Sequence, residues 1–403
     1  MSAASAIRRL AELHADTEIW WDSSPLIFEA WRHDCQRVWA DHPDLLEALE
    51  DLGAFESLDG VFRGCTTNPP LSLQAIEDDP VTWDAWILEQ APDAPSAKEL
   101  LWRTYEEVLR RGTKMLAPLW EESDGRYGHI CGQVDPRDLM DTDLMVAQGQ
   151  RLHAVSPNVM IKMPGTREGI EGIRILSSMG ISTNATLCFS VAQILAVAEA
   201  ARDGFAEARA NGVDMKGARS VATMMLGRME DAPDFGEQAL EQGFELDEVY
   251  RRWAGVAVAR NAYRILQERG LETMLLMASM RMGPTVDGET EIWHLAQVAG
   301  GRTVMTIFPN ILASFIQTYS DRNLEPTIEK PVPHDVLERL LQVPYFHDAY
   351  EPEGVSPQDF GDLPGVRVTG ESFAESMQAL DDHVGAIWAK AHEAEIGRKS
   401  AIS

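Results

Sequence analysis

The sequence predicts an α/β protein built as a (β/α)8 barrel with extra helices and a C-terminal helical extension. Short apolar segments recur along the 403 residues, and each is followed by a longer segment with helical periodicity. There are eight of these segments, the number of strands that close such a barrel. No Gly-x-Gly-x-x-Gly motif follows the first segment, which disfavours a dinucleotide-binding sheet. An open, doubly wound sheet is the alternative architecture.

The eight apolar segments have the lengths of buried strands. The strands are expected at 18–22, 61–66, 128–134, 158–163, 182–187, 219–224, 273–279 and 303–308. The clearest βα unit follows the fourth strand, where Ile170, Ile173 and Leu176 repeat with helical period and Gly180 is a suitable helix stop. Strands that alternate with helices in this way form a parallel sheet.

The interval between the second and third expected strands is too long for one helix. Residues 70–120 are therefore expected to hold extra helices, packed together by Trp83, Trp86 and Trp102.

The C-terminal part of the chain differs in composition from the barrel. Residues 321–365 contain seven prolines, so we expect short helices and irregular chain there. Residues 371–396 have the amphipathic pattern of a helix that docks on the barrel. The expected organisation is a barrel over 1–320, with a Pro-rich segment and a C-terminal helix over 321–403 packed on it as part of the same domain.

Composition and charge exclude several classes of function. Hydrophobic residues make up 45% and charged residues 25%, which excludes a disordered or fibrous chain. No stretch approaches the roughly 18 apolar residues of a membrane span, and residues 1–18 lack the apolar core of a secretory signal. We therefore expect a cytoplasmic protein without a membrane partner. The net charge of −29 repels nucleic acid, so a phosphorylated substrate would need dedicated cations.

Cysteine and histidine spacing gives little support for a metal site. Cys35, Cys65, Cys131 and Cys188 include no Cys-x-x-Cys pair, so we expect buried thiols in a reducing compartment. The ten histidines include no His-x-His or His-x-x-x-His spacing. We expect neither a metal ion nor a cofactor.

Lys162 is the most informative residue of the sequence. Of the seven lysines, it alone lies inside an apolar strand, Val-Met-Ile-Lys-Met-Pro. Burial of an ammonium group costs several kcal/mol unless the group is paired or neutralised. A neutral amine attacks carbonyl groups, so Lys162 can form a Schiff base. The alternative is a lysine that pairs with a carboxylate and only shapes the barrel mouth.

Other polar residues lie at the carboxyl ends of the expected strands, where (β/α)8 barrels have their active sites. Asp22 fits a general acid or base, but Asp22-Ser-Ser-Pro also fits a simple turn. Asn68 precedes a proline, so a loop start explains it equally well. Asn184 and Thr186 alternate with apolar residues and should face the barrel interior, where a polyhydroxylated substrate would pair with them.

Two arginines follow the sixth and seventh expected strands. Arg228 and Arg281 are candidates for a phosphate clamp at the barrel mouth of an acidic protein. Ordinary surface salt bridges are the alternative.

Five segments, in chain order, resemble the transaldolase family. They are CTTNPP (65–70), NVMIKMPGTREG (158–169), GISTNATLCFSVAQ (180–193), SVATMMLGR (220–228) and ASMR (278–281). The final helix also resembles that of longer bacterial members of the family. The resemblance implies a metal-independent class I (β/α)8 enzyme that moves a dihydroxyacetone unit between sugar phosphates, as in pentose phosphate-type interconversion. Such an enzyme is expected here as a monomer or homodimer.

The resemblance also implies roles for individual residues. Lys162 matches the Schiff-base lysine, and Asp22 matches the first-strand aspartate that moves protons during carbon–carbon cleavage. The implied binding residues are Asn68 and Asn184 for the dihydroxyacetone unit, Thr186 for the catalytic water, Arg228 and Arg281 for phosphate, and Thr223, which replaces a serine and keeps its hydroxyl.

Two positions depart from the family pattern. Most transaldolases carry a glutamate on the third strand, where this chain has Gln133, which can orient a water but cannot exchange a proton. The shorter fructose-6-phosphate aldolase branch also has glutamine there, but it carries a tyrosine on the sixth strand. This chain has Met225 at that position, where ordinary transaldolases have phenylalanine. The sequence therefore matches neither branch fully.

Three functions follow as hypotheses. The first is transaldolase-type transfer, which rests on Lys162, Asp22 and both arginines. The second is a Schiff-base aldolase or lyase of the fructose-6-phosphate aldolase type, or one with a pathway-specific sugar substrate, which Gln133 and Met225 favour. The third is a non-catalytic sugar-phosphate binder, which the retention of a lysine in an apolar strand disfavours.

Overall fold

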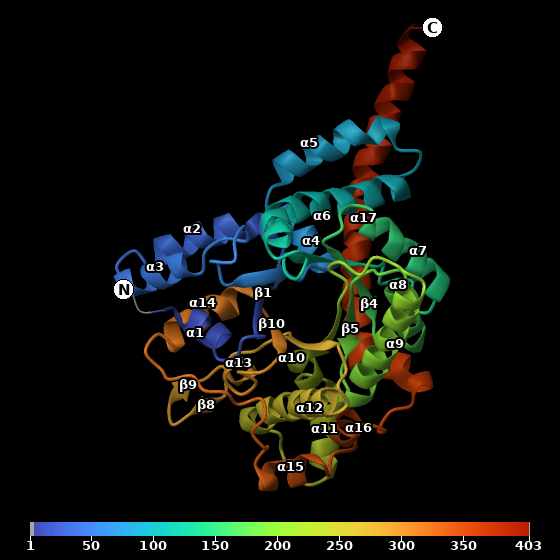
Figure 1. Ribbon diagram of the computed structural model, residues 1–403. Helices are drawn as coiled ribbons and strands as arrows, with labels where there is room; N and C mark the ends of the chain where they lie inside the picture. The colour runs from blue at the N-terminus through green and yellow to red at the C-terminus, as the bar shows by residue number, and fades with distance from the viewer. Residues whose placement is uncertain (1–3, 403) are drawn as a thin grey trace.

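The computed structural model describes residues 4–402 and contains a closed barrel of eight parallel strands (Figure 1). The strands are β1 (Glu18–Trp21), β2 (Phe62–Cys65), β3 (His129–Gln133), β4 (Val159–Pro164), β5 (Thr183–Cys188), β6 (Ser220–Met225), β7 (Met274–Ala278) and β10 (Thr303–Ile307). Barrel closure is direct, because β1 pairs with both β2 and β10. The predicted barrel is therefore confirmed over the open sheet, and all eight strands lie where the apolar segments predict them.

Side-chain alternation along the strands fills the barrel from inside and packs it from outside. Trp20 belongs to an inner cluster that includes Met160 and Leu276. Its neighbour Trp21 packs outside the barrel against Phe28, with ring centroids 5.1 Å apart. A Cβ atom at position 64 would lie 2.5 Å from the Trp20 indole, so the glycine of β2 makes room for this ring. Because side chains fill the interior, a cavity that the strands themselves line can lie only at an end of the barrel.

Helices surround the barrel (Figure 1). Those that follow strands are α7 (Thr142–His153), α8 (Arg167–Ser178), α9 (Val191–Ala210), α10 (Leu226–Glu230), α11 (Pro233–Glu241), α12 (Glu248–Glu268) and α14 (Pro309–Thr318), and the N-terminal ones are α1 (Ala6–Glu12), α2 (Phe28–Val38) and α3 (Pro43–Asp51). After β7 the chain instead forms a small hairpin, β8 (Thr285–Val286) and β9 (Glu289–Thr290), and the short helix α13 (Trp293–Ala296), which the sequence did not predict. No helix of residues 4–402 is long and apolar enough to cross a bilayer.

The interval after β2 holds three helices, as predicted. They are α4 (Pro69–Glu77), α5 (Pro80–Gln90) and α6 (Ala97–Glu122). Trp83 is buried and lies against Trp86, with ring centroids 6.3 Å apart. Trp102 contributes to the main core beside Tyr105.

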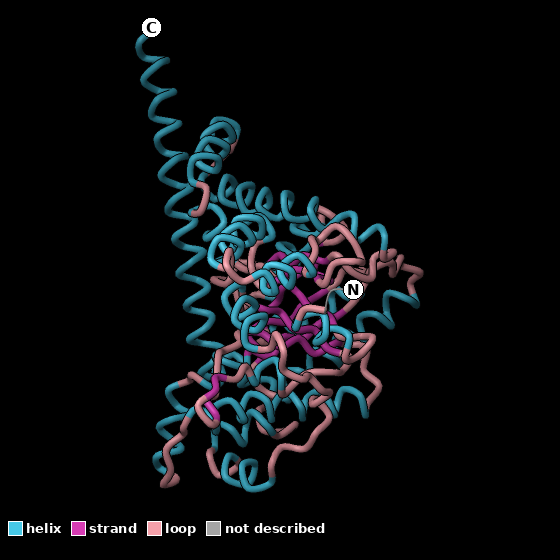
Figure 2. The backbone as a smooth tube through the Cα atoms, turned by 90° about the vertical axis from the view of Figure 1, so that its left-hand side faces the viewer, coloured by secondary structure: helices cyan, strands magenta, loops and turns pink. Residues whose placement is uncertain are grey.

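The C-terminal region contains the short helices α15 (His334–Leu340) and α16 (Pro344–Tyr350) and ends in α17 (Pro364–Ile402). Helix α17 begins earlier than the predicted 371–396, because Pro364 takes its first position, where a missing N–H costs no hydrogen bond. Met377, Leu380 and Val384 of α17 share an apolar cluster with α5 and α6. Figure 2 shows that the last turns of α17 project beyond the rest of the molecule.

Candidate active site

A cavity of about 110 Å³ lies at the carboxyl ends of the strands. Seven of the nine predicted site residues line it: Asp22, Asn68, Lys162, Thr186, Thr223, Arg228 and Arg281. Larger hollows of about 670 and 520 Å³ lie on the outside of the barrel, beside α17 and α12. A third, of about 360 Å³, lies at the opposite end of the barrel, where Glu18, Ser220 and Met274 begin their strands.

Lys162 is buried at the centre of this arrangement. Its relative exposure is 5%, whereas the other five lysines whose side chains are described are exposed. Among the side chains that the structure describes, those of residues 4–393, no carboxylate lies within the 4.0 Å of an ion pair to its ammonium nitrogen. The interpretation of Lys162 as a paired lysine that shapes the barrel mouth therefore finds no partner in the described structure.

Asp22 follows β1 and faces the same cavity. Its Oδ1 accepts a hydrogen bond of 2.7 Å from the Thr66 hydroxyl, which also contacts the hydroxyl of Thr306. Burial raises the pKa of the Asp22 carboxyl, and the positive charge of Lys162 and the Thr66 hydrogen bond offset only part of that effect. A carboxyl with a raised pKa exchanges protons more readily near neutral pH. Thr66 and Thr306 were not among the predicted site residues.

Strand register places three polar residues side by side. Gln133 on β3 pairs with Lys162 on β4, which pairs with Asn184 on β5. Side chains at paired positions of a parallel sheet lie on the same face, so all three belong to one layer of the barrel. Gln133 and Asn184 are buried and are not part of the cavity wall.

The Asn184 amide is held by two neighbours. Its Oδ1 accepts a hydrogen bond of 2.6 Å from the Thr223 hydroxyl, and its Nδ2 donates to the Cys131 sulfur at 3.3 Å. Thr223 thus lines the cavity and orients Asn184 at the same time.

Gln133 is held through its backbone. Its N–H donates to the Tyr105 hydroxyl at 2.9 Å, and burial raises the pKa of that phenol. The Gln133 Oε1 atom is buried, and no donor in the described part of the chain reaches it. A buried amide oxygen without a donor is costly, which is typical of a group that meets its partner only when a ligand or water is bound.

Asn68 combines a structural contact with a place on the cavity wall. Its Oδ1 accepts a hydrogen bond of 2.9 Å from the Leu71 N–H and thereby caps α4. The loop-start interpretation of this residue is therefore correct, and the same side chain also lines the cavity.

The two arginines differ in their partners. The Arg281 guanidinium donates to Asp231 Oδ2 at 2.9 and 3.1 Å and to the Ser279 carbonyl at 3.0 Å. Arg228 makes no hydrogen bond or ion pair with the described side chains of residues 4–393, and its guanidinium carbon lies 5.5 Å from the centre of the Phe373 ring. Burial and the charge of Arg281 lower the pKa of Arg228. Two guanidinium groups that line one cavity are chemically suited to bind an anion.

The backbone near Arg281 is unusual. Ser279 has a φ of +59°, a conformation that is costly for a residue other than glycine and that is common at functional sites. A Cβ atom at Gly227 would lie 2.8 Å from Arg281 Cγ, so the glycine lets the arginine side chain cross the start of α10.

One wall of the cavity was not predicted from the sequence. Phe373 comes from α17, far from the strands in the sequence, and lines the cavity together with Met225 and Phe308. Only the tertiary fold brings α17 to the barrel mouth, so no local pattern marks Phe373. The described side chains, those of residues 4–393, include no group of three or more His, Cys, Asp or Glu that could hold a metal ion.

Fold and cavity together define a (β/α)8-barrel protein whose buried lysine faces a small polar cavity at the carboxyl ends of the strands. The chain belongs to the transaldolase/fructose-6-phosphate aldolase family, because the family model described as "Transaldolase/Fructose-6-phosphate aldolase" matches residues 38–355. The family that the resemblance indicated is thereby confirmed. The match begins after β1 and ends before α17, so Asp22 and Phe373 lie outside it.

Curated relatives carry the name transaldolase. The chain is 32% identical to a transaldolase of Thiobacillus denitrificans over 243 residues, which cover 58% of this chain and 65% of that protein. It is 35% identical to a transaldolase of Mycolicibacterium paratuberculosis over 208 residues, which cover 51% of this chain and 55% of that protein. The chain thus spans less than two thirds of the length of these relatives.

Proposed function

We propose that this protein transfers a dihydroxyacetone unit from a ketose phosphate to an aldose phosphate through a Schiff base on Lys162, without a metal ion. The observation that carries the proposal is Lys162 itself, which is buried without an ion pair and faces a cavity that it shares with Asp22 and two arginines. The family and the names of the relatives support the same type of reaction.

Lys162 supplies the nucleophile. Its neutral amine adds to the ketose carbonyl carbon, and uptake of one proton with loss of water leaves an iminium ion. The iminium accepts the electron pair of the neighbouring carbon–carbon bond when that bond breaks.

Asp22 supplies the base for bond cleavage. Its carboxylate removes the proton from the hydroxyl on the carbon beyond the breaking bond, and the first aldose leaves as the aldehyde. The raised pKa of Asp22 suits this exchange, because the group can also return the proton. The remaining enamine attacks the carbonyl carbon of the second aldose, and hydrolysis of the new iminium releases the product ketose and restores Lys162.

Polar groups around the cavity bind the substrate. Asn184 and Asn68 provide amides for the hydroxyls of the three-carbon unit, and Thr186 and Gln133 are suited to orient the water of iminium formation and hydrolysis. Arg228 and Arg281 bind the phosphate at the other end of the substrate. In this assignment of residues, the reacting carbons of the substrate lie near Lys162 and its phosphate lies near α10.

A transfer assay tests the proposal. Fructose 6-phosphate and erythrose 4-phosphate should give sedoheptulose 7-phosphate and glyceraldehyde 3-phosphate, and Lys162→Met should abolish this turnover. Lys216→Met, at an exposed lysine, is the matched control. Turnover by the Lys162→Met variant at the wild-type rate would exclude the proposed chemistry.

Aldol cleavage without transfer is the second candidate. Two departures from the transaldolase pattern favour it. Gln133 replaces a carboxylate beside Lys162, and Met225 lies on the cavity wall, so both residues alter the environment of the enamine. Release of free dihydroxyacetone from fructose 6-phosphate alone would support the aldolase. A strict requirement for an acceptor aldehyde would exclude it.

A further inference from the structure

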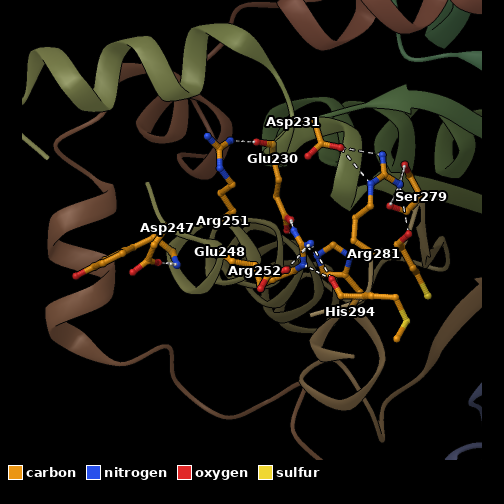
Figure 3. Close-up of polar contacts among 12 residues, drawn as sticks. Glu230, Asp231, Asp247, Glu248, Arg251, Arg252, Ser279, Arg281 and His294 are labelled. Atoms are coloured by element: carbon orange, nitrogen blue, oxygen red, sulfur yellow. Dashed lines mark hydrogen bonds and ion pairs between the residues drawn. The ribbon is translucent and has the colours of Figure 1, made fainter. Parts of the chain in front are cut away.

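A buried polar network lies next to Arg281 (Figure 3). Glu230 of α10 and His294 of α13 are both fully buried, and Glu230 Oε1 lies 2.6 Å from His294 Nε2. Arg252 of α12 donates to the other carboxylate oxygen, Oε2, at 2.7 Å. These three side chains come from three separate helices and meet only in the folded protein.

The network determines which nitrogen of His294 carries the proton. The Arg281 backbone N–H points at His294 Nδ1, 2.9 Å away. A backbone N–H can only donate, so Nδ1 must accept and carries no proton. Nε2 therefore carries the proton and donates it to Glu230. Glu230 in turn selects this tautomer, because a carboxylate only accepts.

The same network holds the chain on the far side of Arg281. The Arg252 guanidinium donates twice to the Met282 carbonyl, at 3.0 and 2.8 Å. The backbone groups of Arg281 and Met282 are therefore both fixed by buried side chains. Space for Glu230 is tight, since a Cβ at Gly255 of α12 would collide with its Oε1.

We propose that His294, held by Glu230 in the tautomer with the proton on Nε2, is a positioning residue for Arg281. The pair fixes the arginine backbone so that the guanidinium stays at the cavity and binds the phosphate end of the substrate. This inference rests on the proposed function, and it extends that function to a pair of residues that do not line the cavity. Neither residue acts on the reacting carbons.

Two substitutions separate the two hydrogen bonds of His294. His294→Gln can still donate to Glu230 from Nε2 but offers no acceptor at the Nδ1 position. His294→Asn keeps an acceptor near Nδ1 and loses the contact with Glu230. His334→Gln, at an exposed histidine of α15, is the matched control. Circular dichroism and thermal melting establish that each variant is folded.

Borohydride trapping of the Schiff base provides the readout, with two ligands that differ in phosphate. His294→Gln should raise the half-saturating concentration of fructose 6-phosphate about tenfold, the usual cost of one lost buried hydrogen bond, and leave that of dihydroxyacetone at the wild-type value. His294→Asn should stay closer to wild type. Equal weakening for both ligands, or none for either, would overturn the inference.

Two further measurements keep the test decisive. If His294→Gln does not fold, Glu230→Gln takes its place, because an amide no longer selects the tautomer and should cause the same phosphate-specific loss. If wild type forms no adduct with either ligand, the proposed function fails, and inorganic phosphate binding is measured by calorimetry instead. In that case His294→Gln should weaken phosphate about tenfold relative to His334→Gln, and an equal affinity would overturn the positioning role.

Discussion

The ionisable side chains of the cavity are buried in a way that lowers the stability of the fold. Lys162 and Asp22 are both about 5% exposed, and neither has an ion-pair partner within 4.0 Å in the described residues. Burial of ionisable groups without a close partner destabilises a fold, and such groups persist where they serve a function.

Asp22→Asn should stabilise the protein at neutral pH and remove turnover. Folding raises the pKa of Asp22 above its ordinary value of 3.8, so folding favours the protonated form. The stability linked to Asp22 is complete below pH 3.8 and declines as the pH rises through the raised pKa. The variant should therefore gain about 1 kcal/mol at pH 8 and less near pH 3.8, measured by chemical denaturation. A gain that shrinks as the pH rises would contradict this assignment.

Gln133→Met should also stabilise the protein, because it removes a buried amide oxygen that no described residue satisfies. We expect the free energy of unfolding to rise by about 1 kcal/mol and Schiff-base formation to slow. Gln193→Met is the matched control. Gln193 is equally buried, but its amide accepts from the Phe189 N–H at 2.8 Å and donates to the Gly165 carbonyl at 2.7 Å. That variant should lose stability, and a similar loss at Gln133 would contradict the account.

Helix α17 connects the outer helices with the cavity. Leu380 packs against α5 and α6, whereas Phe373, earlier on the same helix, lines the cavity below Arg228. One element thus contributes both to the fold and to the wall of the site.

Phe373→Ala should separate these two contributions. We expect a loss of about 3 kcal/mol in stability from the cavity it leaves. We also expect the KM for fructose 6-phosphate to rise about fivefold, because Arg228 loses its aromatic contact. Leu380→Ala should cost similar stability with an unchanged KM. Steady-state kinetics at a temperature where both variants are folded measures the difference, and equal KM values would refute the role of Phe373.

The sequence predicts the barrel strands but not the small hairpin after β7. The eight barrel strands are almost entirely buried and rich in apolar residues, and this local property made them predictable to within one or two residues. The hairpin β8–β9 has two residues per strand and both strands are exposed, so no apolar pattern marks it. The residues in and around the cavity differ in the same way in how far the sequence predicts them. Lys162 stands out against its own strand, whereas Glu230 and His294 are 64 residues apart and meet only in the folded chain.

The net charge of the whole protein affects which ligands it can bind. A charge of −29 repels polyanions, so the arginines at the cavity act against the general field. A single phosphate group that enters the cavity meets Arg228 and Arg281 at close range, where their attraction exceeds the screened repulsion of distant carboxylates.

Inorganic phosphate should therefore compete with fructose 6-phosphate for the cavity, whereas a short DNA duplex at the same phosphate concentration should not. Arg228→Ala should weaken the competition about tenfold, because it removes a charge-assisted hydrogen-bond donor. Inhibition of Schiff-base trapping measures both effects. Competition by the duplex at physiological salt would contradict the charge argument.

The central claim is that Lys162 forms a covalent bond with a ketose. Its most direct test is treatment of the protein with fructose 6-phosphate and borohydride, followed by mass spectrometry of the peptides, with Lys162→Met as the control. The account predicts a reduced three- or six-carbon adduct on the peptide that contains Lys162, and none in the variant. An adduct on another lysine, or turnover of the ketose without any adduct, would contradict it.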